Sequence, residues 1–170
     1  MTAPNKQSGD TQVDTLAADA SVGSSPRSSF SGIWLSRYEY FSTERDATFT
    51  VLYFVQVQQD GKQLKVRSLP GSESPLTMAL TLKGDVVTGT WEESTATDGY
   101  YGGAQYHGAI QMVMKPSGWR MSGRWLGLGP DPAQGDNAHM EVNTGPWELV
   151  FVEPSTSQET IDLYSNRTWI

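Results

Sequence analysis

Residues 47–69 read ATFTVLYFVQVQQDGKQLKVRSL, and this stretch decides the fold class. Its first half carries an apolar side chain at every second position, and that face consists of Phe49, Val51, Tyr53, Val55 and Val57. A period of two is typical of a strand in an antiparallel sheet that has one buried and one wet face. Gln59-Asp60-Gly61 follows, and its glycine supplies the positive φ of a tight hairpin. The stretch therefore predicts two antiparallel strands joined by a short turn.

Strand character recurs on both sides of this hairpin, and no window shows a helical period of comparable length. The eight predicted strands are 31–41, 47–58, 62–69, 74–82, 85–93, 105–115, 118–126 and 145–152. Sequence neighbours joined by short turns favour an all-β, eight-stranded antiparallel up-and-down β-barrel, with the eighth strand closing on the first. A β-sandwich whose long loops cover the core is the alternative.

The connections between the predicted strands differ in length according to their order. The even-numbered connections are tight turns at 59–61, 83–85 and 116–118. The odd-numbered connections are longer, at 42–46, 70–73, 94–104 and 127–144. In a meander all the odd connections fall at one end. One end of the predicted barrel is therefore closed by short turns, and the other end carries the longer loops. Loops on a rigid scaffold commonly carry function, which indicates one working mouth.

Composition sets the outer limits of the domain and of its partners. Residues 1–29 are rich in small and polar side chains and predict a disordered tail; 30–152 form the barrel domain and 153–170 a flexible C-terminal tail. The net charge of −7 argues against binding to nucleic acid or to an anionic membrane. The absence of cysteine excludes disulfides and thiolate chemistry. Without an apolar leader segment, a cytoplasmic location is expected.

Aromatic residues and glycines supply most of the candidate binding residues. Trp34, Trp91 and Trp125 each follow a glycine by two residues, a placement that lets a strand coil sharply while the indole fills space. The segment 98–108 combines glycines with Tyr100, Tyr101, Tyr106 and His107, and tyrosine suits ligand recognition.

Few ionisable residues suggest chemistry. Glu92 and Glu93 are adjacent in a strand and point to opposite faces, so Glu93 points inward if Trp91 does. His107 and His139 lie on different elements with no ligand partner at a fixed spacing, which predicts no metal site. We expect no cofactor and assign no catalytic residue, because no nucleotide fingerprint or catalytic triad is present.

Several phrases between Ser31 and Val152 are similar to a known family. They are Ser68-Leu-Pro, Thr88-Gly-Thr-Trp-Glu-Glu, Gly99-Tyr-Tyr-Gly-Gly-Ala-Gln-Tyr-His-Gly-Ala-Ile-Gln111, Met121-Ser-Gly-Arg-Trp125 and Asn143-Thr-Gly-Pro-Trp-Glu-Leu149. They resemble the C-terminal domain of actinobacterial helix-turn-helix regulators of the Xre type. Gly32-Ile33-Trp34 also resembles the opening motif of calycins and lipocalins, in which the Trp plugs the closed end of the barrel. The resemblance implies a calycin-like sensor domain, here without the DNA-binding part, since residues 1–29 cannot hold a helix-turn-helix.

Three functional hypotheses follow. The leading one is a non-enzymatic, sensor-like module that takes a small, partly apolar or aromatic molecule at the long-loop end. The second is a module that binds a protein partner through Tyr- and Trp-rich loops. The third is an enzyme in which Glu93, His107 and tyrosines transfer protons on a hydrophobic substrate. The candidate ligand-binding residues are Trp34, Tyr38, Tyr53, Trp91, Glu93, Tyr100, Tyr101, Tyr106, His107 and Trp125.

Overall fold

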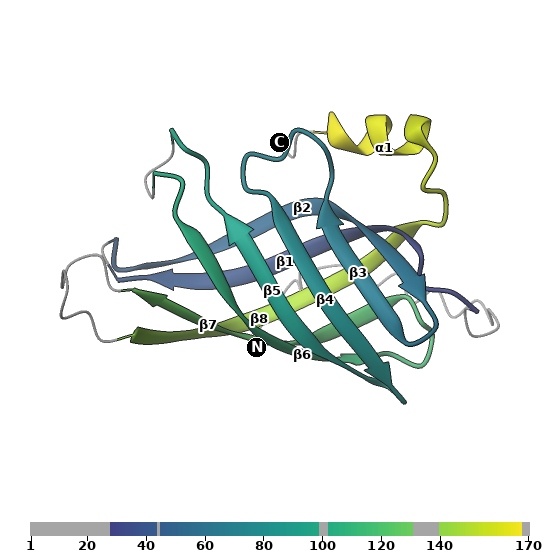
Figure 1. The fold of residues 1–170 in the computed structure, drawn as a ribbon, viewed down its shortest axis with the longest axis horizontal. Coiled ribbons are helices and arrows are strands. Elements are labelled where there is room, and N and C mark those ends of the chain that lie inside the picture. Colours follow the sequence, from purple (N-terminus) through teal and green to yellow (C-terminus); the bar gives the residue numbers. More distant parts are fainter. Residues whose placement is uncertain (1–27, 44, 99–101, 131–139, 168–170) are drawn as a thin grey trace, which may run out of the picture.

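The protein is an eight-stranded antiparallel barrel with one helix on its outside (Figure 1). A computed structural model describes residues 28–43, 45–98, 102–130 and 140–167. The strands are β1 (Gly32–Ser42), β2 (Ala47–Asp60), β3 (Gln63–Ser68), β4 (Leu76–Lys83), β5 (Val86–Ser94), β6 (Gln105–Met114), β7 (Arg120–Pro130) and β8 (Met140–Glu153). The helix is α1 (Gln158–Ser165).

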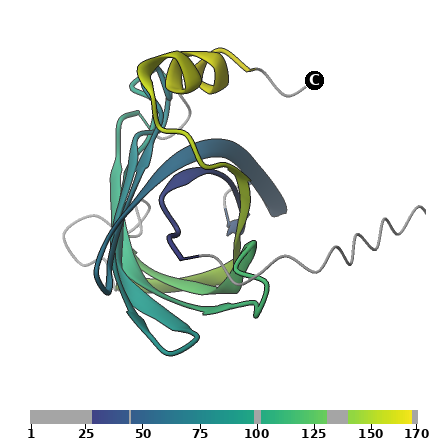
Figure 2. The ribbon, with the colours of Figure 1, turned by 90° about the vertical axis from the view of Figure 1, so that its right-hand side faces the viewer.

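Each strand pairs antiparallel with its sequence neighbours, and β8 closes the sheet on β1. In that last pairing Tyr38 of β1 stands opposite Trp147 of β8, and Ser36 stands opposite Leu149. Figure 2 looks along the barrel and shows the ring of strands, with α1 outside it. The predicted up-and-down barrel, closed between its first and last strands, is confirmed.

Alternation along the strands assigns the side chains to the interior or to the surface. The apolar face predicted for 47–58 is turned inward, with Val55 and Val57 fully buried and Val51 and Tyr53 packed against the core. On β4 the same rule buries Leu76, Met78 and Leu80. The interior is therefore lined by every second residue of the meander, as the period of two predicts.

The two ends of the barrel differ. At the tight-turn end, Gly61, Gly84 and Gly118 all adopt positive φ in the short connections. Trp34 fills this end: its ring is fully buried, contacts Phe151 edge-on at 5.4 Å, and its indole N–H donates to the carbonyl of Phe30 at 2.9 Å. At the opposite end, which we call the long-loop end, lie the connections that precede β2, β4, β6 and β8.

The connection between β7 and β8 is shorter than predicted. Strand β7 continues to Pro130 and β8 begins at Met140, so the sequence prediction of a loop over 127–144 was too long. Gly127 is not a turn residue: it lies inside β7, where a Cβ atom would come within 2.8 Å of the Trp125 ring and 3.1 Å of the Trp91 ring. Glycine in this strand makes room for two indoles, and the sequence pattern did not distinguish that role from a loop.

The C-terminal segment is more ordered than a flexible tail. Ser157 caps α1 by accepting from the backbone N–H of Thr160, and Ile161 is buried against Ile33, Phe54 and Leu69 on the outer face of the barrel. Tyr164 adds an edge-on contact with Phe54 at 4.7 Å. The helix forms because one apolar side of it packs on this patch. The disorder predicted for residues 1–29 concerns mainly 1–27, which lie outside the described residues.

We predict that Ile161→Ala lowers the free energy of unfolding by about 2 kcal/mol, because it leaves a cavity between α1 and the barrel. Leu163→Ala on the same helix is the matched control: Leu163 is 56% exposed, so its loss should change stability by less than about 0.5 kcal/mol. Denaturant titration and amide exchange of α1 measure both effects. Equal effects of the two substitutions would show that α1 is not docked through Ile161.

Candidate ligand-binding site

A carboxyl group is placed inside the barrel at the long-loop end. Glu93 is the penultimate residue of β5 and points inward with Trp91, opposite Leu76 of β4 and Tyr106 of β6 in the two ladders. From β1, Tyr38 reaches it, and its hydroxyl donates to both carboxylate oxygens, at 2.9 Å to Oε1 and 3.0 Å to Oε2. A partly buried carboxyl and a buried phenol therefore meet from strands that are far apart in the sequence.

Burial dominates the ionisation of this carboxyl. Loss of solvation raises the pKa of Glu93 from its ordinary 4.5 to about 7, although the hydrogen bond from Tyr38 acts in the opposite direction. The same burial, followed by the charge of Glu93, raises the pKa of Tyr38 well above its usual range. Tyr38 thus stays a neutral donor, while Glu93 changes its charge near neutral pH.

Tyr53 contributes a second phenol with an unused hydroxyl. Its oxygen is buried and makes no hydrogen bond of normal geometry within the described residues. Burial and the charge of Glu93 raise its pKa well above the usual value, and a side-chain interaction with the Ser36 hydroxyl, too poorly aligned to be a normal hydrogen bond, acts in the opposite direction. A buried hydroxyl without a partner costs about 1–3 kcal/mol, which makes this atom the exception in the interior.

Aromatic rings connect these polar groups across the barrel. Successive ring centroids lie 6.3 Å apart for Tyr53 and Tyr38, 4.6 Å for Tyr38 and Trp147, 5.8 Å for Trp147 and Trp91, and 5.6 Å for Trp91 and Trp125. We call Glu93, Tyr38 and Tyr53 the mouth cluster and these rings its floor. The oxygen atoms of the mouth cluster thus lie next to the apolar faces of these aromatic rings.

The indole N–H groups of the floor already donate hydrogen bonds within the protein. Trp147 donates to the Ser36 hydroxyl at 2.9 Å, Trp125 to the carbonyl of Glu39 at 3.0 Å and Trp91 to the carbonyl of Leu126 at 3.3 Å. These bonds fix the ring planes and stabilise the wall. The hydrogen-bonding capacity left over lies in the mouth cluster.

The structure gathers most of the candidate residues predicted from the sequence, and separates others. Tyr38, Tyr53, Trp91, Glu93 and Trp125 lie together, and Tyr106 packs against the same core. Trp34 lies at the tight-turn end of the interior, the end that this residue was expected to close. Tyr100 and Tyr101 lie outside the described residues.

His107 does not join the mouth cluster. It is exposed and pairs with Glu92 on the outer face, whereas Glu93 points inward from the next position. The third hypothesis requires an imidazole and a carboxylate to converge, and these two lie on opposite sides of the barrel wall. The alternation of β6 already separates Tyr106 from His107, a signal that the sequence analysis did not apply.

Sequence reasoning missed Trp147 and Ser36 as parts of the site. Trp147 connects Tyr38 to Trp91, and Ser36 holds its indole. The signal was present in the glycine at 145, two residues before the tryptophan, and in the inward face that Trp147 shares with Leu149 and Phe151. The sequence pattern does not contain the register that brings β8 beside β1.

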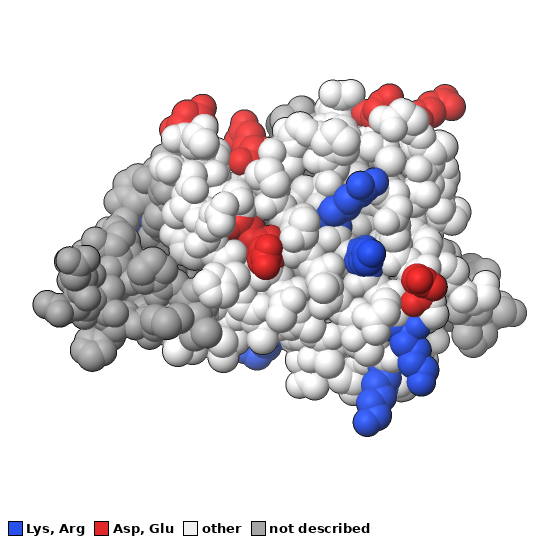
Figure 3. All heavy atoms as spheres, in the orientation of Figure 1, with Lys and Arg blue, Asp and Glu red and all other residues white. Residues whose placement is uncertain are grey.

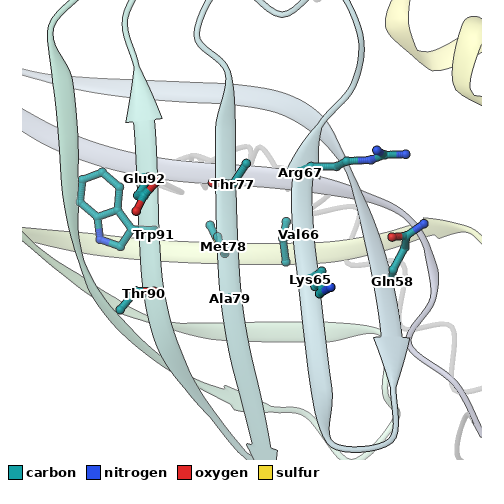
Figure 4. A pocket seen from close by; sticks show the side chains of 10 residues that line it. All are labelled: Gln58, Lys65, Val66, Arg67, Thr77, Met78, Ala79, Thr90, Trp91 and Glu92. Carbon is teal, nitrogen blue, oxygen red and sulfur yellow. The ribbon is translucent and has the colours of Figure 1, made fainter.

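A hollow lies on the outer face of β2 to β5, with a volume of about 450 Å³ (Figure 4). Its outward side chains, Lys65, Arg67, Thr77 and Glu92 among them, are all exposed. Figure 3 shows acidic and basic side chains interspersed on this face. It lacks the buried polar atoms of the mouth cluster, so we place the candidate site in the barrel interior.

No group of three or more potential metal ligands occurs in the described part of the chain. Within the same residues, no helix has the length and apolar character needed to cross a membrane. Comparison with protein-family models finds no match, and neither does comparison with curated proteins or with solved structures. The class defined by fold is an eight-stranded up-and-down barrel, and the resemblance to Xre-type regulators stays a prediction.

We predict that Glu93→Gln makes the protein more stable at pH 8 than at pH 4.5 relative to the wild type. Because the folded-state pKa of about 7 exceeds the ordinary 4.5, the carboxyl stabilises the fold fully below pH 4.5 and loses that contribution as pH rises through 7. The change in relative stability should be about 2–3 kcal/mol, measured by urea titration at both pH values. Glu92→Gln, the exposed neighbour, should show no such pH dependence.

Proposed function

We propose that the chain is a non-enzymatic binding module whose barrel takes a small, partly apolar or aromatic molecule at the long-loop end. The observation that carries this is the buried hydroxyl of Tyr53, which makes no hydrogen bond of normal geometry among the described residues and lies within the influence of the Glu93 charge. A ligand that entered the mouth would supply the missing hydrogen bond and would rest on the aromatic floor. An eight-stranded barrel is wide enough for its own side chains or for one small ligand.

The mouth cluster suits recognition better than core packing. In a barrel filled only for stability, an apolar side chain at position 93 would continue the contacts of Leu76 and Tyr106. A carboxyl there costs free energy when it is ionised, since burial raises its pKa. Polar groups that are unfavourable for folding and gathered at one end of a barrel are typical of binding sites.

Proton-transfer catalysis has weaker support. The mouth cluster has a carboxyl that titrates near neutral pH, which a general acid or base requires. The imidazole that was expected to join it lies on the outer face, and both phenols have pKa values raised above their usual range. The cluster therefore fits holding a ligand better than moving protons.

The second candidate function, binding to a protein partner, rests on a different observation. Phe41, Leu126 and Val142 are 51%, 40% and 58% exposed on the outside of β1, β7 and β8. Single apolar side chains at a surface are common, so this observation weighs less than a buried unsatisfied hydroxyl.

We predict that Tyr53→Phe stabilises the ligand-free protein by about 1 kcal/mol and weakens ligand binding. Removing an unsatisfied buried hydroxyl relieves its desolvation cost, but it also removes the group that the ligand would use. Small apolar and aromatic compounds are screened by thermal shift and tryptophan fluorescence, and affinities for hits are compared between wild type and variant. Tyr164→Phe on the outer helix is the matched control and should change neither property.

Two results would contradict the proposal. One is a screen in which no compound raises the melting temperature or alters the fluorescence, since a ligand that binds only the folded state must stabilise it. The other is a set of hits whose affinities are the same for wild type and Tyr53→Phe.

A further inference from the structure

The mouth cluster has more hydrogen-bond acceptors than donors. An ionised carboxylate can accept about four hydrogen bonds, and Glu93 receives one hydrogen, from Tyr38, shared between its two oxygens. The hydroxyl oxygen of Tyr53 is a further acceptor, because within the described residues it makes no hydrogen bond of normal geometry and only Ser36 approaches it. A ligand that completes this cluster must therefore bring several donors to one point.

No cation among the described residues balances the charge of Glu93. The groups that face it are Leu76 from β4, Tyr106 from β6, Tyr38 from β1 and Tyr53 from β2, and Tyr40 lies next to Tyr38. The two ion pairs seen in the described residues, Arg37–Glu39 and Arg120–Glu148, do not involve it.

The arginine at this end is engaged elsewhere. Arg45 donates to the hydroxyl of Tyr40 at 2.9 Å, and its guanidinium lies 3.7 Å from the ring centre of Phe49. Burial is accordingly the largest influence on the pKa of Glu93, and no positive charge contributes to it. Among the described residues, the partly buried carboxylate of Glu93 therefore has no counter-ion.

Aromatic faces surround the place where a counter-ion would sit. Tyr38 contacts Tyr40 at 6.2 Å and Tyr53 at 6.3 Å between ring centres, and Trp147 and Trp91 continue the floor. The faces of such rings attract cations within about 6 Å, most strongly where water is excluded. An ammonium group also has three donors and no acceptor, which matches the excess of acceptors.

We propose that the mouth cluster recognises a protonated primary amine carried on an aromatic or other apolar body. The ammonium group donates to the Glu93 carboxylate and to the Tyr53 hydroxyl, and the apolar body lies against the aromatic floor. This inference rests on the proposed function and adds the class of ligand to it. A ligand with a carbonyl group is the competing chemistry, because it would need Glu93 protonated as a donor.

The test compares three compounds that share one ring and differ in charge: 2-phenylethylamine, 2-phenylethanol and phenylacetate. Calorimetric titration of the full chain at pH 8 should give an affinity for the amine at least about tenfold above that for the alcohol, and none for the acid. Between pH 8 and pH 6 the amine affinity should fall about tenfold, because the ionised fraction of a carboxyl with a pKa near 7 falls from about nine-tenths to one-tenth.

Two substitutions that remove the same charge locate the effect. Glu93→Gln should bring the amine and the alcohol to within about threefold of each other, whereas Glu92→Gln, on the exposed face of the same strand, should leave the preference intact. The dependence of the wild type on pH tests the inference even if the Glu93 variant folds poorly.

Several outcomes overturn the inference. They are an alcohol that binds as tightly as the amine, an amine affinity that rises toward pH 6, and equal losses in the two variants, which would indicate general attraction to an acidic protein. If neutral compounds in the wider screen bind while these preferences are absent, the amine inference fails and the binding function stands. If no compound binds in either experiment, both fail.

Discussion

The pairing of β8 with β1 fixes the direction of every side chain in the barrel. Once Tyr38 stands opposite Trp147, the period of two assigns each residue around the ring to the interior or to the surface. A slip of one residue would turn Trp147 outward and Glu148 inward. Closure also limits the interior to what eight strands can enclose, so inward side chains and any ligand compete for the same space.

That space is filled unevenly along the barrel axis. Trp34 and the fully buried aliphatic residues around it occupy the tight-turn end, where no polar group goes without a partner in the described residues. Toward the long-loop end the indoles need room that an ordinary strand does not provide. Gly108 supplies it on β6, where a Cβ atom would lie 2.8 Å from the Trp91 indole nitrogen. The glycines therefore make the packing of the large rings possible. The mouth cluster lies on the side of these rings that faces the long-loop end.

The barrel was predictable from the sequence because its determinants are local. Alternation in 47–58 and glycine at 61 specify a strand and a turn without reference to the rest of the chain. The inward direction of Glu93 likewise follows from that of Trp91, two residues earlier. The meeting of Tyr38 with Glu93 was not predictable, since it joins residues 55 positions apart across the interior. It depends on the stagger of the strands, which no local pattern contains, and the same is true of the place where β7 ends.

A carboxyl in this position links folding, protonation and binding. The folded protein favours the protonated form because burial raises the pKa of Glu93 to about 7. A bound cation would have the opposite preference and would return the pKa toward its ordinary 4.5. Loss of the proton and binding of the cation would therefore favour each other. Under the proposed function, a cationic ligand that replaced this proton would recover the free energy lost when the ionised carboxylate is buried, and it would do so at the position where Tyr38 holds the carboxyl.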